Sequence, residues 1–528
     1  MLAKSIAMVY SKTSNNPAKH RAENKCRRSL RESCENINFS RDLRYFCGAK
    51  GDNKKPHAAN LQQPERPSEI LMRQSYTSSA SCFNRTHGFI AILALNLFAA
   101  SGLSQSSNPP DVVYVLGDDQ AWSDYSFMGH PHIKTPNLDR LARESLLYTR
   151  GYVPDSLCRP SLATMISGLY PHQHGIVGND PPPSEVRNNG DVRKSGRGGL
   201  YRDAAYQKDI EKYLTLHIDK IETLPDRLKT LGYTCFQSGK WWEGNFSRAG
   251  FDAGMTHGDH SRGARHGDKG LEIGRTTMKP IEEFVASARQ ANKPYFLWYA
   301  PMLPHTPHDP PADLLEKYKP LAPTGSIAKY WAMCERFDNS IGELLKIIEQ
   351  RGRPDNTLIV FACDNGWINL PDQSAYAPKS KRSQYDGGIR TPIMFHWPAK
   401  VTPQRNEEDL ASTIDLVPTV MSLVGLPPDS ALPGVDLSKP SSAAARVSIF
   451  GEIFEHDIVD MDNPRSSLMY RWVVDGHTKL IVPEPSRFPN AQVELYDLAN
   501  DPWEKENLAE LQGDSVRSLR GKLDAWWK

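Results

Sequence analysis

The sequence predicts an α/β fold with a large, mostly parallel central sheet flanked by helices. Short, nearly continuous apolar runs recur along the chain, and such runs are typical of strands buried on both faces of a parallel sheet. Segments with helical periodicity lie between these runs, and the alternation indicates an α/β fold. After about Pro433 the pattern changes to short, closely spaced strands, which predicts a smaller C-terminal antiparallel α+β subdomain.

The first apolar run, residues 111–116, lies between Pro110 and Gly117 and is the first predicted buried strand. A helix is predicted over 135–144, with Thr135 as its N-cap and Pro136 in its first turn. Further buried strands are predicted at 233–236, 295–300, 357–361 and 392–395, with helices that include 281–290 and 330–351. The subdomain is predicted to contain strands at 447–450, 469–474, 478–482 and 494–498 and a final helix at 514–527. Long loops are expected at 180–206 and 245–269.

The N-terminal part of the chain differs from the rest. Residues 1–71 carry 14 Lys and Arg against 7 Asp and Glu and lack a sustained apolar period, so we expect a disordered or incorrectly assigned extension. Residues 72–104 combine a basic start, an apolar run from Phe89 to Ala100 and small residues after it, which is typical of a secretory signal peptide. The alternative is a buried core helix. The run is too short to span a bilayer, so no stable membrane span is expected.

From this pattern we expect translation to start at Met72, the mature protein to begin near Gln105, and export to the periplasm or the medium. A catalytic domain is predicted over 108–430 and the C-terminal subdomain over 431–528. The whole chain of 528 residues has a formal net charge of only +2, and the part after residue 71 is mildly acidic, which disfavours nucleic-acid binding.

The cysteines argue against a zinc site made of thiolates. Four of the eight lie before the predicted mature protein (Cys26, Cys34, Cys47 and Cys82). The other four are widely spaced, without a Cys-x-x-Cys pair (Cys158, Cys235, Cys334 and Cys363). The last three allow one disulfide in an oxidising compartment, and buried free thiols are the alternative.

Two pairs of oxygen ligands follow predicted buried strands. Asp118-Asp119 comes directly after the first strand, and Asp364-Asn365 follows the strand at 357–361. Each pair alone is most simply a solvated turn. Because ligands bind at the carboxyl ends of parallel strands, the two pairs together predict a site for a hard cation such as calcium or magnesium.

Four other residues are candidates for chemistry. Cys158 precedes a short apolar helix that ends at Gly168, and a helix start favours an anion there, although a lone cysteine is often simply buried. Lys240 and Lys381 are two cations that, taken singly, would be ordinary surface lysines. His305 lies between prolines after the strand that ends at Ala300, where it is either a general acid or a structural histidine.

Taken in order, these motifs resemble those of the type I, formylglycine-dependent sulfatases of the alkaline phosphatase superfamily. The resemblance runs from about Pro109 to the end of the chain. It rests on Asp118-Asp119, Cys158-Arg159-Pro160-Ser161 extended through Gly168-Leu169-Tyr170-Pro171-His172, Gly239-Lys240-Trp241, Pro304-His305-Thr306-Pro307, Asp364-Asn365-Gly366, Tyr385-Asp386-Gly387-Gly388-Ile389-Arg390 and the closing Glu494-Leu495-Tyr496-Asp497-Leu498 with Asn500-Asp501-Pro502 and Glu506-Asn507-Leu508.

The resemblance implies a mechanism. A formylglycine-generating enzyme would convert Cys158 to formylglycine, one hydroxyl of the hydrate would attack the sulfur of a sulfate ester, and the other would later expel sulfate. Calcium would be held by the modified residue 158 and by Asp118, Asp119, Asp364 and Asn365. Asp364 would also take the proton of the attacking hydroxyl.

The resemblance also implies how the substrate is bound. Lys240 and Lys381 would bind sulfate oxygens, and His305 would protonate the leaving alcohol or hold the sulfate. The family usually has Arg at the position of Leu162 and His at the position of Trp242. Either Trp242 forms a wall on which a sugar stacks, or a histidine of the 245–269 loop (His257, His260 or His266) supplies the missing imidazole.

The predicted function is hydrolysis of sulfate esters, with a sulfated carbohydrate or polysaccharide as the substrate. Two alternatives remain open at this point. One is a phosphatase or phosphodiesterase of the same superfamily, against which Cys158 argues. The other is a catalytically silent carbohydrate-binding relative, which Leu162 makes plausible.

Overall fold

The computed structural model describes residues 109–180, 215–258, 265–460 and 463–527. The predicted N-terminal extension, the predicted signal peptide and His260 lie outside these residues, as does nearly all of the predicted loop 180–206. None of the helices in the described ranges combines the length and the apolar character needed to cross a membrane.

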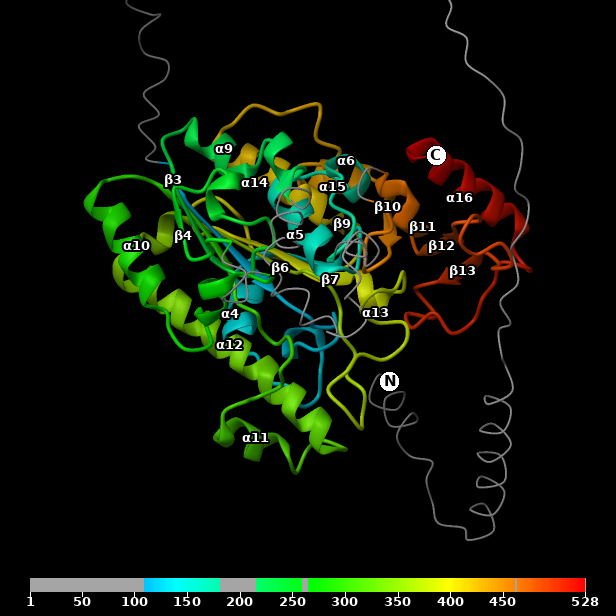
Figure 1. Cartoon of the computed structure of the whole chain (residues 1–528), viewed down its shortest axis with the longest axis horizontal. Helices are drawn as coiled ribbons and strands as arrows, with labels where there is room; N and C mark the ends of the chain where they lie inside the picture. Colours follow the sequence, from blue (N-terminus) through cyan, green and yellow to red (C-terminus); the bar gives the residue numbers. More distant parts are fainter. Residues whose placement is uncertain (1–108, 181–214, 259–264, 461–462, 528) are drawn as a thin grey trace, which may run out of the picture. The chain divides into compact units, whose positions relative to one another are not determined.

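A mixed nine-stranded sheet forms the centre of the protein (Figure 1). Its order is β4-β3-β5-β1-β6-β7-β2-β8, and β9 pairs with β2. All neighbours are parallel except β7, which runs antiparallel to both β6 and β2. The strands are β1 (Asp111–Gly117), β2 (Leu146–Tyr152), β3 (Thr234–Gly239), β4 (Ala253–Gly254), β5 (Tyr295–Ala300), β6 (Thr357–Cys363), β7 (Arg390–His396), β8 (Gln404–Asn406) and β9 (Ala411–Ser412). The predicted mostly parallel sheet is confirmed.

Helices cover both faces of this sheet (Figure 1). Successive strand residues point to opposite faces, so in β1 Val112, Tyr114 and Leu116 join one apolar cluster, whereas Val113 and Val115 join the other. The first cluster includes α5, α9 and α14, and the second includes α4, α10 and α12. The helices are α4 (Pro136–Arg143), α5 (Cys158–Ser167), α6 (Pro171–His174), α9 (Leu224–Lys229), α10 (Lys279–Gln290), α11 (Ala312–Tyr318), α12 (Gly325–Arg351), α13 (Asp386–Ile389), α14 (Leu416–Val424) and α15 (Pro440–Ala445).

Several elements differ from their predicted extents. Helix α12 begins at Gly325, five residues before the predicted start, because the Thr324 side chain accepts the Ile327 N–H at 3.3 Å and caps it. Thr135 stands at the N-cap of α4, but its hydroxyl bonds Ser126 and Asp139 rather than a helix N–H. Strand β2 was not predicted.

The C-terminal subdomain is an antiparallel sheet covered by a helix. Its strands pair in sequence order and are β10 (Ser448–Phe454), β11 (Leu468–Asp475), β12 (Thr478–Pro483) and β13 (Glu494–Asp497). Helix α16 (Gly513–Trp526) packs Leu519 and Leu523 against Leu480 and Leu495 of this sheet. The predicted smaller antiparallel subdomain is confirmed.

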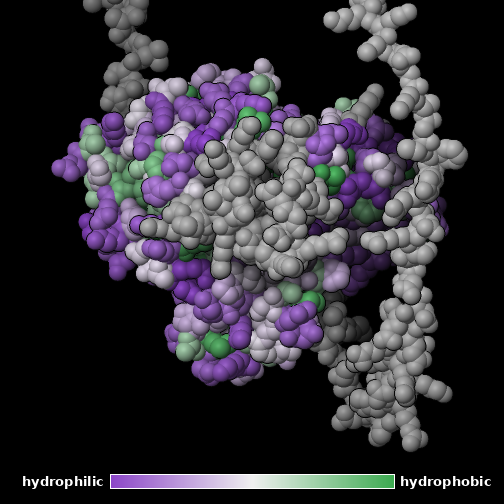
Figure 2. Space-filling model, in the orientation of Figure 1, coloured by the Kyte–Doolittle hydropathy of each residue, from purple (hydrophilic) through white to green (hydrophobic). Residues whose placement is uncertain are grey.

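The cysteines and the surface complete the description. All four cysteines of the described ranges are buried free thiols, so of the two alternatives left open by the sequence the free thiols hold. They lie in separate elements: Cys235 and Cys334 belong to apolar clusters, whereas the thiols of Cys158 and Cys363 both contact Asn365. On the visible described surface hydrophilic residues predominate, with apolar residues scattered among them (Figure 2).

Candidate active site

The two predicted pairs of oxygen ligands lie side by side. Strands β1 and β6 are parallel neighbours whose last residues, Gly117 and Cys363, are in register. Asp118-Asp119 and Asp364-Asn365 therefore leave the sheet at the same edge. Asp119 adopts a φ of 67°, and its N–H donates to Asp364 Oδ1 at 3.2 Å. The Asn365 side-chain amide donates to Asp119 Oδ1 at 2.6 Å.

Both predicted lysines reach these carboxylates. Lys240 follows β3, and its Nζ donates to Asp118 Oδ1 at 2.6 Å and to Asp364 Oδ2 at 3.3 Å. Lys381 Nζ donates to Asp119 Oδ1 at 2.5 Å. Burial disfavours the charge on each lysine, but the surrounding carboxylates outweigh it and raise the pKa of both, so both are cations at neutral pH.

Cys158 is the first residue of α5 and lies at the centre of this group. Its Sγ is 3.2 Å from Lys381 Nζ, and its thiol donates to Asn365 Oδ1 at 3.4 Å. Burial raises the pKa of the Cys158 thiol to about 12, although both lysines act in the opposite direction. The unmodified side chain is therefore a neutral thiol at neutral pH, and the structure does not prepare a thiolate nucleophile.

His305 reaches the same carboxylates from the segment after β5. Its Nδ1–H donates to the Thr306 carbonyl at 2.6 Å, and its Nε2 lies 3.5 Å from Asp119 Oδ2. Burial lowers the pKa of His305 to about 3 against the opposing effect of Asp119. The imidazole is therefore neutral in this environment, with Nε2 as the nitrogen that faces the site.

The residues present suit a divalent cation. Three buried carboxylates meet only two lysines, and among the described residues Asp118 Oδ2 and Asp119 Oδ2 have no hydrogen-bond partner. Burial and the Asp118 charge raise the pKa of Asp364 to about 7, which reflects this excess of negative charge. Ligand atoms of Asp118, Asp119, Cys158 and His305 all lie within 4.8 Å of one another.

Trp242 stands where the family has a histidine after the Lys-Trp motif, and a histidine from a distant segment lies beside it. Trp242 is buried, and its ring contacts His266 edge-to-face with 4.5 Å between centroids. The His266 ring lies 5.9 Å from that of His305. His257 instead is exposed and donates its N–H to Asp268 at 2.8 Å. Of the two described candidates, His266 is therefore the one at the site.

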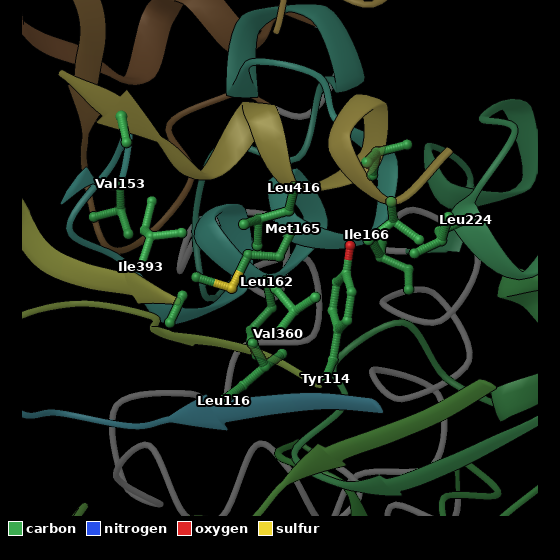
Figure 3. Close-up of a cluster of buried hydrophobic side chains, with 14 of the residues drawn as sticks. Tyr114, Leu116, Val153, Leu162, Met165, Ile166, Leu224, Val360, Ile393 and Leu416 are labelled. Atoms are coloured by element: carbon green, nitrogen blue, oxygen red, sulfur yellow. The ribbon is translucent and has the colours of Figure 1, made fainter. Parts of the chain in front are cut away.

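Leu162 faces the sheet. It lies in the apolar cluster with Leu116, Val360, Met165 and Leu416 (Figure 3). All ten residues of α5 are buried, so an unpaired guanidinium at this position would be costly. The substitution therefore completes an apolar contact between α5 and strands β1 and β6.

Sequence reasoning missed two contacts that shape the site. Arg159 and Glu243 form a buried bidentate ion pair, with bonds of 2.6 and 2.8 Å, which joins the start of α5 to the segment after Lys240. The Trp367 ring lies 5.8 Å from Lys381 Nζ. The only sequence signal was adjacency, because Arg159 follows Cys158 and Glu243 follows Trp242.

The sequence of this chain is similar to those of known proteins. The Sulfatase family matches residues 110–426, which is more than half of the chain, and the family described as N-sulphoglucosamine sulphohydrolase, C-terminal, matches residues 376–525. The chain is 26% identical over 389 residues to N-acetylgalactosamine-6-sulfatase of Canis lupus familiaris, covering 66% of this chain and 69% of that protein. It is 28% identical over 392 residues to human arylsulfatase A, covering 65% and 70%.

Solved structures share the fold. The PsFucS1 sulfatase from Pseudoalteromonas sp. superposes with a TM-score of 0.57 at 19% identity, covering 82% of this chain and 91% of that one. A protein solved in complex with its substrate D-glucosamine-2-N,6-O-disulfate gives a TM-score of 0.56 at 18% identity, covering 79% and 97%. The chain therefore belongs to the sulfatase family of the alkaline phosphatase superfamily and is a sulfuric ester hydrolase.

Proposed function

We propose that this sulfatase removes sulfate from a carbohydrate, with residue 158 as formylglycine and with calcium bound at the ends of β1 and β6. The observation that carries the proposal is the convergence of Cys158 with Lys240, Lys381 and the two oxygen-ligand pairs. Two cations at one buried point suit a sulfate ester, because they complement the negative charge spread over its three free oxygens and the charge that develops on the leaving oxygen in the transition state.

The modification and the metal have defined places in this proposal. When present, formylglycine supplies a hydroxyl nucleophile and calcium neutralises charge on the sulfate. Asp118, Asp119, Asp364 and Asn365 hold the cation, which the two unpartnered carboxylate oxygens support. Asp364 also takes the proton released by the nucleophile.

The remaining polar residues bind the ester. Lys240 and Lys381 each place an ammonium against the sulfate oxygens, and each exchanges part of its present carboxylate contact for that contact. His305 acts through Nε2, which must carry a proton in order to assist the leaving alcohol or to hold the sulfate. Trp242 would line the sugar-binding part of the site, and its ring has Arg265 at 4.8 Å from its centroid and His266 at its edge.

A sulfated carbohydrate is proposed because one relative and one structural neighbour are named for such substrates. One relative is an N-acetylgalactosamine-6-sulfatase, and one structural neighbour holds a sulfated glucosamine as its substrate. The signal-peptide pattern of residues 72–104 supports export of the enzyme, to the periplasm or the medium, where sulfated polysaccharides occur.

Release of free sulfate tests the activity. We expect one or more members of a panel of sulfated monosaccharides and polysaccharides to be hydrolysed by protein coexpressed with a formylglycine-generating enzyme. Cys158→Ala should abolish this turnover, whereas Cys235→Ala, which removes another buried thiol from β3, should leave it unchanged. Hydrolysis of phosphate esters in preference to sulfate esters would refute the proposal.

Mass spectrometry of the peptide that contains residue 158 tests the modification separately. We expect an aldehyde or its hydrate at this position after coexpression, despite Leu162. An unmodified thiol together with full sulfatase activity would refute the formylglycine assignment. An unmodified thiol without activity would favour a silent relative.

A further inference from the structure

Residues 379–390, called the Lys381 segment below, have close backbone contacts on both sides of the site. The Gly366 N–H donates to the Gly388 carbonyl at 2.8 Å, directly after Asn365. The Arg382 N–H donates to the Ser156 carbonyl at 3.2 Å, two residues before Cys158. A Cβ at position 366 would lie only 2.1 Å from the Gly387 carbonyl oxygen. The position of this segment therefore sets where Lys381 stands relative to the nucleophile and the carboxylates.

A buried group of three charges fastens this segment to the C-terminal subdomain. Lys479 of β12 lies 2.9 Å from Asp386 Oδ1 and 2.7 Å from Glu504 Oε1, and all three side chains are at most 1% exposed. The Asp386 N–H donates to Glu504 Oε2 at 2.6 Å. The hydroxyl of Tyr152 donates to Asp386 Oδ2 at 3.1 Å. We call Asp386, Lys479 and Glu504 the buried triad.

The buried triad is poorly explained by stability alone. Moving three charged groups out of water costs more free energy than burying an apolar cluster of the same volume. A buried group of ion pairs is therefore weak evidence that it stabilises the fold. Glu504 also adopts a φ of 54°, a left-handed conformation that strains a residue with a Cβ. Burial raises the pKa of Glu504 to about 7, against the effect of Lys479. The triad instead fixes the relative positions of its three side chains, because each of them can hydrogen-bond the other two in only a few arrangements.

A second set of contacts joins the same two parts. Lys379 Nζ donates to the Glu504 carbonyl, and the Tyr385 hydroxyl donates to Glu494 of β13 at 2.8 and 3.0 Å. The Lys381 segment is thus held by the subdomain before and after Lys381. The contacts come from two different elements of the subdomain, β12 and β13, and from the loop that carries Glu504.

We propose that Lys479 and Glu504 are positioning residues for catalysis, which hold the Lys381 segment so that Lys381 Nζ stands between Asp119 and residue 158. The C-terminal subdomain is then part of the catalytic apparatus, although none of its charges in the buried triad reaches the sulfate. This inference rests on the proposed role of Lys381 in binding sulfate.

A double-mutant cycle with Lys381 tests the proposal. Lys479→Met should lower kcat/KM by about 100-fold, the size of effect expected from a misplacement of about 1 Å. In a Lys381→Met background the same substitution should cause no further loss, because its effect passes through Lys381. The substrate is the most rapidly hydrolysed member of the sulfated saccharide panel. Equal fold-losses in both backgrounds would overturn the proposal.

Hydrogen exchange gives a readout that does not depend on turnover. Lys479→Met should accelerate exchange of the backbone amides of the Lys381 segment while α5 and β6 keep their protection. Unchanged exchange in the segment would overturn the proposal. If Lys381→Met keeps wild-type activity, the proposed role of Lys381 fails, and exchange alone then decides whether the triad positions the segment.

Two further variants separate positioning from general destabilisation. Glu504→Gln keeps an acceptor for the Asp386 N–H and should give a smaller loss in the same direction if Lys479→Met does not fold. Arg353→Met breaks the ion pair with buried Asp111 at the amino end of β1, the end of the strand opposite the site. It should lower the melting temperature without changing kcat/KM. A fall in kcat/KM as large as that of Lys479→Met would overturn the proposal.

Discussion

Gly239→Ala should displace Lys240 from the site. Gly239 is the last residue of β3, has a φ of 84°, and directly precedes Lys240. A Cβ added there would lie 2.0 Å from the Ala300 carbonyl oxygen of the neighbouring strand β5. That same oxygen accepts the Lys240 N–H at 2.6 Å. The substitution therefore disturbs the backbone contact that sets the direction in which Lys240 leaves the sheet.

The magnitude follows from two separate effects. The left-handed conformation costs a residue with a Cβ about 1–2 kcal/mol of folding free energy. The contact of 2.0 Å must also lengthen to at least 3.0 Å, so the backbone beside Lys240 must move by about 1 Å. A displacement of that size at a substrate-binding group lowers the rate by about 100-fold. We therefore expect Gly239→Ala to lose both stability and kcat/KM.

Gly232→Ala is the matched control. Gly232 has a φ of 81°, but no atom lies within 4 Å of the position its Cβ would take. It should lose about 1–2 kcal/mol of unfolding free energy for the same backbone reason and keep its sulfatase activity. Urea unfolding and sulfate release measure the two effects. Full activity in Gly239→Ala, or an equal fall in kcat/KM in both variants, would refute the reasoning.

Three other predictions concern the metal, the pH and a buried ion pair. Removal of metal with EDTA should stop turnover and lower the melting temperature. Calcium at 100 times its Kd should restore about 2.7 kcal/mol of unfolding free energy. A melting temperature that does not change with calcium would contradict the metal assignment. Burial raises the pKa of Asp338 to about 6, above the unfolded value near 3.8. The contribution of its protonated form to the free energy of unfolding is therefore complete below pH 4, and about 3 kcal/mol of it is lost as the pH rises through 6. Asp338→Asn should remove that part of the pH dependence in urea unfolding at pH 4 and 7, and an unchanged slope would contradict it. Arg446→Met should cost about 3 kcal/mol in urea unfolding, because Asp415 is fully buried and both of its oxygens contact the guanidinium at 2.7 Å, whereas wild-type stability would show that Asp415 does not need this cation.

The sequence alone was sufficient to predict the two strands whose carboxyl ends carry the site. After Asp111 and Thr357, the runs at 111–116 and 357–361 are continuously apolar because both faces of the central sheet are covered, and this continuity is visible without a structure. The polar residues that follow them mark the carboxyl edge of the sheet. The predicted ligand pairs lie together because β1 and β6 are adjacent and in register.

Strand β2 shows why one central strand could not be predicted. Its sequence is interrupted by Thr149, Arg150 and Gly151, yet all three are buried. Arg150 is satisfied by the carbonyls of Glu408 and Gly476. A Cβ at position 151 would lie 2.4 Å from the Thr391 carbonyl oxygen of β7, so only glycine fits there. These partners are at least 240 residues away in sequence, and no local sequence pattern predicts them.

Local chemistry in the chain thus determined the fold class, the ends of the main strands and the types of residue at the site. Those properties depend on hydrophobic continuity and on residues a few positions apart. Tertiary structure alone decided that His266 lies beside Trp242, that Leu162 faces the sheet, and that Lys479 and Glu504 contact Asp386 of the Lys381 segment. The physical reason is that these contacts join residues from separate elements, whose pairing is settled only by how the helices and sheets pack.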